Sequence, residues 1–162
     1  MTIQEINEFV NDWLYDHDFD IEAKMGTSFM VDLATNVLYY TPIYYDELDA
    51  ILLEEITKSF PFAKNWDRNI MFLVSFFHEV GHVETECEWT KKDFANFFLW
   101  KVSNSAEMER NPSTSTVVEY FRHPIEWRAT EWACEYIDKN WEEVGAFGQR
   151  LVELLQEFYQ ED

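Results

Sequence analysis

The sequence predicts a compact α+β protein that is mostly helical, with a small β-hairpin or sheet near its amino terminus packed on a central helix. Apolar residues recur at helical spacing through most of the 162 residues, whereas strand-like runs are confined to residues 28–40. Residues 70–77 form an almost wholly apolar run, which is typical of a helix buried in a core. The length corresponds to a single domain that covers residues 1–162.

The first half of the chain is predicted to form a helix, a hairpin and a second helix. Thr2 and Glu5 match the capping box with which many helices begin, so the first helix starts at the amino terminus. A connection of only Ala34 and Thr35 separates two runs rich in β-branched and aromatic residues, which favours a hairpin. Pro61 ends the second helix, because a residue that precedes proline disfavours the helical conformation. The expected ranges are 2–14, 28–33, 36–40 and 45–60.

Four further helices are predicted in the second half. His123-Pro124 is expected to interrupt the third of them, and residues 103–116, which are polar and contain Asn111-Pro112, are expected to form a mobile surface loop that could border the functional site. The ranges of the four helices are 67–84, 90–102, 117–139 and 141–159. The second of these helices is expected to turn its large apolar residues toward the core, namely Phe94, Phe97, Phe98 and Leu99.

Composition narrows the classes of function. Hydrophobic residues make up 47% of the chain and aromatic residues 18%, which argues against a disordered protein despite a net charge of -20. Acidic side chains outnumber basic ones by 32 to 12, and binding to phosphates needs clustered lysine and arginine, so direct binding to nucleic acid is not expected. The negative charge either keeps the protein in solution or attracts a basic protein surface.

The cellular location is predicted to be the cytoplasm. Residues 1–6 lack the basic and apolar regions of a secretory signal, and no apolar run approaches the length needed to span a membrane. Cys87 and Cys134 are expected to be reduced thiols, because the chain shows no export signal. The sequence leaves the oligomeric state open.

His78-Glu79-Val80-Gly81-His82 is the most informative segment of the chain. Residues four apart lie on one face of a helix, so the imidazoles of His78 and His82 can bind one metal ion. Glu79 can then take a proton from metal-bound water and return it to the departing amine, which is the chemistry of a zinc hydrolase. The apolar run that leads into the segment favours a rigid, deeply placed helix.

A zinc ion in a hydrolase needs a third protein ligand and an open position for water or substrate. One class of zinc peptidases places a third histidine six residues after the second, but that position is Glu88 here, so a downstream carboxylate is favoured. Glu126 shares a helical stripe with the small residues Ala129 and Ala133, which would let its helix approach the motif helix closely. The other candidates are Glu131, Glu119 and His123, and His123 could instead donate to a developing oxyanion.

Between about residues 25 and 138 the chain resembles the ImmA/IrrE family of zincin-like metallopeptidases. That family has an N-terminal helix, a small sheet, a helix with His-Glu-x-x-His and a later helix with Glu-x-x-Ala-x-x-aromatic-Ala. The matching residues are His78, Glu79 and His82 for the first motif and Glu126, Ala129, Trp132 and Ala133 for the second. The chain departs from the family after the second motif, where Cys134-Glu135-Tyr136-Ile137-Asp138 replaces a Leu-Leu-Met-Pro-like continuation.

The resemblance implies a compact zincin-like fold and a Zn²⁺-dependent endopeptidase, with His78, His82 and Glu126 as metal ligands and Glu79 as the catalytic residue. Its partner would be a protein or peptide substrate inside the cell, such as a regulator or repressor of a phage or mobile element. The net charge of -20 supports an alternative from another class, in which an acidic, non-enzymatic protein on a degenerate zincin scaffold mimics DNA or inhibits a basic, DNA-binding host protein. A third hypothesis is a metal that only stabilises the fold.

Overall fold

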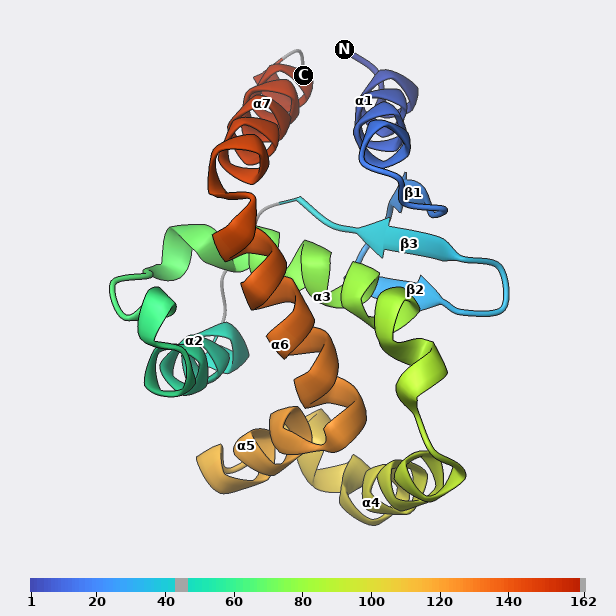
Figure 1. Cartoon of the computed structure of the whole chain (residues 1–162), viewed down its shortest axis with the longest axis vertical. Coiled ribbons are helices and arrows are strands. Elements are labelled where there is room, and N and C mark those ends of the chain that lie inside the picture. The colour runs from blue at the N-terminus through green and yellow to red at the C-terminus, as the bar shows by residue number, and fades with distance from the viewer. Residues whose placement is uncertain (43–46, 161–162) are drawn as a thin grey trace.

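The computed structural model of the chain describes residues 1–42 and 47–160 and is α+β, with helices predominating (Figure 1). The α-helices in these residues are α1 (Ile3–Asp16), α2 (Glu47–Ser59), α3 (Met71–Thr85), α4 (Lys91–Arg110), α5 (Thr114–Arg122), α6 (Pro124–Lys139) and α7 (Trp141–Gln160). Short 3-10 helices lie at Pro61–Ala63, Arg68–Ile70 and Glu86–Glu88. The strands are β1 (Glu22–Met25), β2 (Met30–Asp32) and β3 (Val37–Tyr40).

Most of the predicted elements are present at the expected places. The capping box of Thr2 and Glu5 begins α1, and the predicted interruption at His123-Pro124 separates α5 from α6. Helix α2 follows the sheet as predicted, although residues 45 and 46 of its expected range lie outside the described residues.

The predicted hairpin is present as β2 and β3, which pair antiparallel, but the sheet also contains a strand that was not predicted. Strand β1 pairs parallel with β3, so the order is β1-β3-β2 and β2 lies at an edge. Apolar residues Phe19, Ile21, Ala23 and Met25 alternate with acidic or basic ones, and the first three are buried, so the segment does carry the period of a half-buried strand. Side-chain amides of α1 also hold β1: Asn11 bonds to both backbone groups of Ala23, and the Asn7 amide oxygen accepts from the backbone of Met25.

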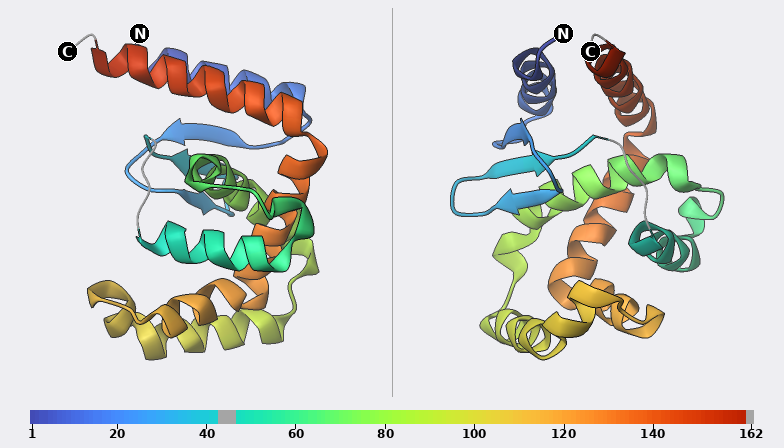
Figure 2. Two further views of the ribbon diagram at one scale, coloured as in Figure 1. Left: turned by 90° about the vertical axis from the view of Figure 1, so that its left-hand side faces the viewer. Right: turned by 180° about the vertical axis from the view of Figure 1, so that it is seen from behind.

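Helix α3 runs through the centre of the molecule. Helices α1 and α7 lie at one end of the molecule, and α4 and α5 lie at the opposite end (Figure 2). Helix α6 crosses α3 closely, as the stripe of small residues predicted. A Cβ atom built on Gly81 would lie 2.6 Å from the carbonyl oxygen of Ala129, so only glycine permits this approach. Aromatic rings fill the space toward α1 and α7, where Phe147 lies 4.5 Å from Trp13 and 5.5 Å from Phe76 between ring centroids. Among the described elements, α3 and α6 share the most extensive contact, and both motifs found in the sequence lie on these two helices.

The prediction of a mobile loop over residues 103–116 is wrong. Helix α4 continues to Arg110, and α5 begins at Thr114 after a short connection. Polar side chains in this stretch bond within the helix, since the Asn104 amide donates to the Trp100 carbonyl and the Ser105 hydroxyl donates to that of Val102. Residues 103–110 contain neither glycine nor proline, so their polarity did not indicate irregular structure, and the helix ends only at Asn111-Pro112.

The expected orientation of α4 is also wrong for three of its four large apolar residues. Phe94, Phe98 and Leu99 are 61%, 60% and 62% exposed, and only Phe97 is buried, at 6%. The inner face of α4 is set by Phe97 and Trp100, whose rings pack on Tyr120 and His123. Apolar residues occupy more than one face of this helix, so periodicity alone could not decide which face turns inward.

The structure also bears on membrane-spanning segments and on the state of the cysteines. None of the helices in the described residues is both long and apolar enough to cross a membrane. Both cysteines are free thiols, Cys87 at the surface and Cys134 in the core.

Candidate metal centre

Helix α3 carries the two motif histidines on one face, one turn apart. Their ring centroids lie 4.6 Å apart, and the residues are only 9% and 8% exposed for His78 and His82. The helix can sit so deep because most of its other residues are apolar and buried, including Phe76, Phe77 and Val80. Imidazoles held between packed apolar side chains have few alternative rotamers, as a metal site requires.

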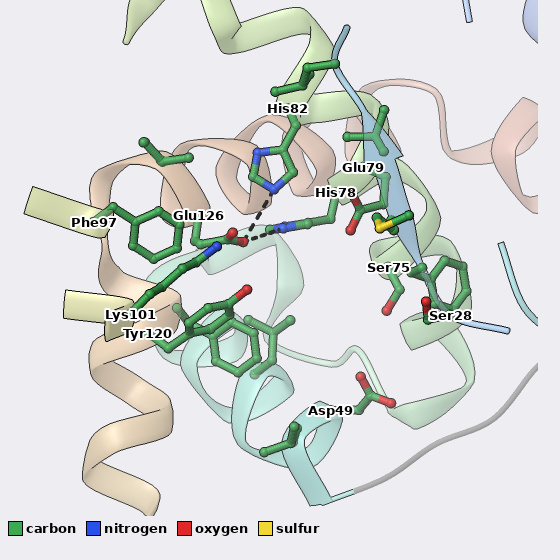
Figure 3. Close-up of a pocket in the computed structure, with 18 of the residues that line it drawn as sticks. Ser28, Asp49, Ser75, His78, Glu79, His82, Phe97, Lys101, Tyr120 and Glu126 are labelled. Atoms are coloured by element: carbon green, nitrogen blue, oxygen red, sulfur yellow. Dashed lines mark hydrogen bonds and ion pairs between the residues drawn. The ribbon is translucent and has the colours of Figure 1, made fainter. Parts of the chain in front are cut away.

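Helix α6 brings Glu126 to both imidazoles, as Figure 3 shows. One carboxylate oxygen, Oε2, lies 2.8 Å from Nε2 of His78 and 3.4 Å from Nε2 of His82. Glu126 is in the first turn of its helix and is only 6% exposed. The close contact of Gly81 with Ala129 brings α6 near enough for Glu126 to reach across.

The three donor atoms fit a zinc ion. Zinc binds imidazole nitrogen and carboxylate oxygen at about 2.0–2.2 Å, so donors in a tetrahedral site lie about 3.3 Å apart. The separations of 2.8 and 3.4 Å fall on either side of that value, so small side-chain movements would make room for the ion. Two imidazoles and one carboxylate are also a known zinc donor set that leaves one position open.

Glu79 is a second carboxylate at the site. Ligand atoms of His78, Glu79 and His82 all lie within 4.8 Å of one another, so this group could also hold a metal ion. Glu126 is the better third ligand, because its oxygen is nearer to both nitrogens. The Glu79 carboxylate lies on the other side of His78, toward Ser75 and Ser28 (Figure 3). Burial raises the pKa of Glu79 above its usual value of 4.5, although the nearby histidines partly oppose the shift.

His78 and Glu126 perturb each other in opposite directions. Burial alone would lower the pKa of His78, but the hydrogen bond and negative charge of Glu126 outweigh it, and the pKa rises above 6.5. Burial would likewise raise the pKa of Glu126, yet its contacts with both histidines hold that pKa well below 4.5. Each of the two groups therefore favours the charged form of the other.

Thr130 orients His78 from behind, and the sequence did not single it out. Its hydroxyl oxygen lies 3.0 Å from Nδ1 of His78, and the residue is fully buried. When Nδ1 of a neutral imidazole donates this bond, the lone pair is on Nε2, which can then bind a metal ion. Thr130 is four residues after Glu126 on α6, so helical spacing could have indicated it. Nδ1 of His82, by contrast, is buried and has no hydrogen-bond partner among the described residues.

The metal centre opens into a cavity of about 650 Å³. The cavity is bounded by β2, α2 and α3 on one side and by α4, α5 and α6 on the other. Lys101 and Tyr120 lie beside Glu126 in it (Figure 3). No spacing along the sequence singles out either residue, because Lys101 belongs to α4 and Tyr120 to α5. Burial raises the pKa of Tyr120, and the charges of Glu126 and Glu79 raise it further, so the phenol keeps its proton.

The other candidates for the third ligand do not line this cavity. Glu119 and Glu131 are exposed, and Glu119 accepts a hydrogen bond from the Trp100 indole 3.1 Å away. His123 packs its ring on Phe97, with 4.8 Å between the ring centroids. Of these candidates, only Glu126 is brought to the histidine pair.

Comparisons with known protein families, curated proteins and solved structures gave no match to this chain. The likeness to the ImmA/IrrE family accordingly rests on the two motifs.

Proposed function

We propose that this protein is a zinc-dependent endopeptidase of ImmA/IrrE type, which hydrolyses a peptide bond in an intracellular protein such as a regulator or repressor of a phage or mobile element. One observation carries the proposal. The side chains of His78, His82 and Glu126 converge within 3.4 Å at the wall of an open cavity, with the carboxylate of Glu79 close by.

Each residue of the candidate site has its own role in peptide hydrolysis. Zinc bound by His78, His82 and Glu126 would supply Lewis acidity and a water molecule whose pKa falls to about 7. Glu79 accepts the proton of that water and delivers it to the departing amine, and a raised pKa suits this double role. The Tyr120 phenol and the Lys101 ammonium face the same cavity and can stabilise negative charge that develops on the carbonyl oxygen.

The walls of the cavity suit a polypeptide substrate. Strand β2 is at the edge of the sheet, and its residues Met30 and Val31 line the cavity, so an extended chain can lie along this edge beside the bond from the Val31 backbone to Glu79. The opposite wall is largely apolar and aromatic, through Phe97, Phe121 and Ile125. Such a cleft can align the peptide backbone while apolar side chains occupy the far wall.

The decisive experiment measures metal content and proteolysis together. Protein purified without added metal should contain about one zinc ion per chain by elemental analysis. The His82→Ala variant should lose the metal, because it loses a ligand. The Glu79→Gln variant should keep zinc and lose at least about 100-fold in cleavage rate, because it lacks the general base. Hydrolysis by Glu79→Gln at the wild-type rate would contradict the assignment of the base.

An acidic binding protein is the second candidate, favoured by the net charge of -20. In that case the protein would bind a basic or DNA-binding partner without cutting it, and the histidine pair would be a remnant. A metal-free protein that binds such a partner with full activity would support this candidate over the peptidase. Unfolding by a chelator without any peptidase activity would instead indicate a structural metal.

A further inference from the structure

The outer face of α4 exposes a row of large apolar side chains. Phe94, Phe98 and Val102 are spaced four residues apart and lie on one face, with Leu99 beside them, and each is about 60% exposed. We call these four residues the α4 ridge. Scattered exposed apolar residues are normal, but a contiguous row of this size marks an interaction site in most soluble proteins.

The α4 ridge is continuous with the cavity of the candidate metal centre. Phe94 belongs to both, because it lines the cavity and is 61% exposed. Phe97 and Lys101 of the same helix also line the cavity. A polypeptide that leaves the cavity past Phe94 therefore meets Phe98 and then Val102 on the outer surface.

We propose that the α4 ridge docks an amphipathic helix of the substrate protein, next to the segment that enters the cavity. The inference rests on the proposed function. Side chains four residues apart form the ridges that pack into the grooves of a second helix, so a helix with a stripe of leucine, isoleucine or methionine fits this face. Helix α4 itself carries four basic and three acidic side chains, so the polar face of the docked helix can be uncharged.

The test separates binding from cleavage by use of the Glu79→Gln background. The probe is a fluorescent amphipathic peptide of leucine and glutamine, about 18 residues or five helical turns long, together with a scrambled peptide of the same composition. Phe98→Glu and Val102→Glu should each weaken binding of the amphipathic peptide at least about tenfold, because a charge replaces a buried apolar contact. The control is Tyr15→Glu on α1, a residue that is 82% exposed at the other end of the molecule, and it should bind like the parent.

The remaining outcomes are distinguishable. Equal binding of the scrambled peptide, no binding by the parent, or unchanged binding by Phe98→Glu would each overturn the docking site. Light scattering that reveals a dimer, split by Phe98→Glu, would also overturn it, because a second copy would then cover the ridge. Ridge-dependent binding by a protein that holds no zinc and cleaves nothing would support the docking surface while the peptidase proposal fails.

Discussion

Helices α3 and α4 both carry clusters of phenylalanine, yet they meet opposite environments. Phe72, Phe76 and Phe77 of α3 are 5%, 0% and 0% exposed, whereas Phe94 and Phe98 of α4 are about 60% exposed. Helix α3 is surrounded by the sheet and by several other helices, while α4 packs on α5 and α6 at one end of the molecule (Figures 1 and 2). Position in the fold, more than apolar content, decides whether a side chain stabilises the core or remains available to a partner.

Matched substitutions of phenylalanine test this contrast most strongly. Phe76→Ala should lower the free energy of unfolding by about 3–5 kcal/mol, because it leaves a cavity among packed rings. Phe98→Ala should change it by less than about 0.5 kcal/mol, since the side chain is mostly in water already. Urea denaturation of both variants measures the difference. Similar losses for the two would show that α4 packs more closely than the structure indicates.

The same contrast explains which parts of the fold the sequence could predict. Residues 70–77 are apolar on every side, so burial of α3 was predictable whatever its orientation. Helix α4 has apolar residues on two faces, and only the neighbours Tyr120 and His123 determine that Phe97 turns inward. Strand β1 was not predicted, although Phe19, Ile21, Ala23 and Met25 alternate with acidic or basic residues. Its parallel pairing with β3 and its bonds to side chains of α1 are contacts between separate elements, which no local pattern reveals.

Two helical glycines provide the next test, because they differ only in what lies beside them. A methyl group on Gly81 would lie 2.6 Å from the carbonyl oxygen of Ala129. Gly81→Ala should therefore cost about 1–3 kcal/mol of stability and weaken zinc binding, as α6 and Glu126 move away from the histidines. Gly145→Ala in α7 has nothing within 4 Å of the new methyl and should gain about 0.5–1 kcal/mol from helix propensity.

Thermal denaturation and zinc titration of both variants check this pair. A stable Gly81→Ala protein with wild-type zinc affinity would mean that the close crossing of α3 and α6 does not position the site.

The site was predictable to the extent that its residues share a helix. His78, Glu79 and His82 form a local pattern, and Glu126 belongs to a second pattern on α6. Lys101 and Tyr120 come from α4 and α5, and they reach the cavity only because those helices pack beneath it. Such contacts cannot be predicted from spacing along the sequence, because they depend on how separate helices pack.

Thr130 supports His78 from α6, and its loss should have a smaller effect than loss of the helix crossing. Thr130→Val removes the hydroxyl 3.0 Å from Nδ1 of His78 while it nearly preserves the shape of the side chain. Supporting groups of this kind typically contribute 10–100-fold to metal affinity, so zinc affinity should fall by about that factor. Thr130→Ser should restore most of it.

A second buried threonine provides the control. The Thr85 hydroxyl donates to the Gly81 carbonyl within α3, at 2.7 Å, and is not bonded to either histidine. Thr85→Val should leave zinc affinity unchanged. Equal losses for Thr85→Val and Thr130→Val, measured by competition with a chromogenic chelator, would indicate a general loosening of the core.

The effect of pH should be the most gradual, and it should have opposite signs with and without zinc. In the metal-free protein, the lowered pKa of Glu126 stabilises the fold above pH 4.5 and ceases to do so as pH falls through the folded value. The raised pKa of Glu79 makes stability fall as pH rises above 4.5, and that of His78 makes it fall further above 6.5. These three groups together favour the metal-free fold most near pH 4.5.

Zinc reverses this trend, because it binds only the neutral imidazole, which becomes available as pH rises through the raised pKa of His78. The increase in Tm caused by saturating zinc should therefore grow steadily between about pH 6 and 8. The control is His17→Gln, which removes a histidine that stacks on Trp13 outside the cavity and should leave the trend intact. A zinc-induced increase in Tm that is constant over this range would mean that zinc binding does not compete with protonation of His78.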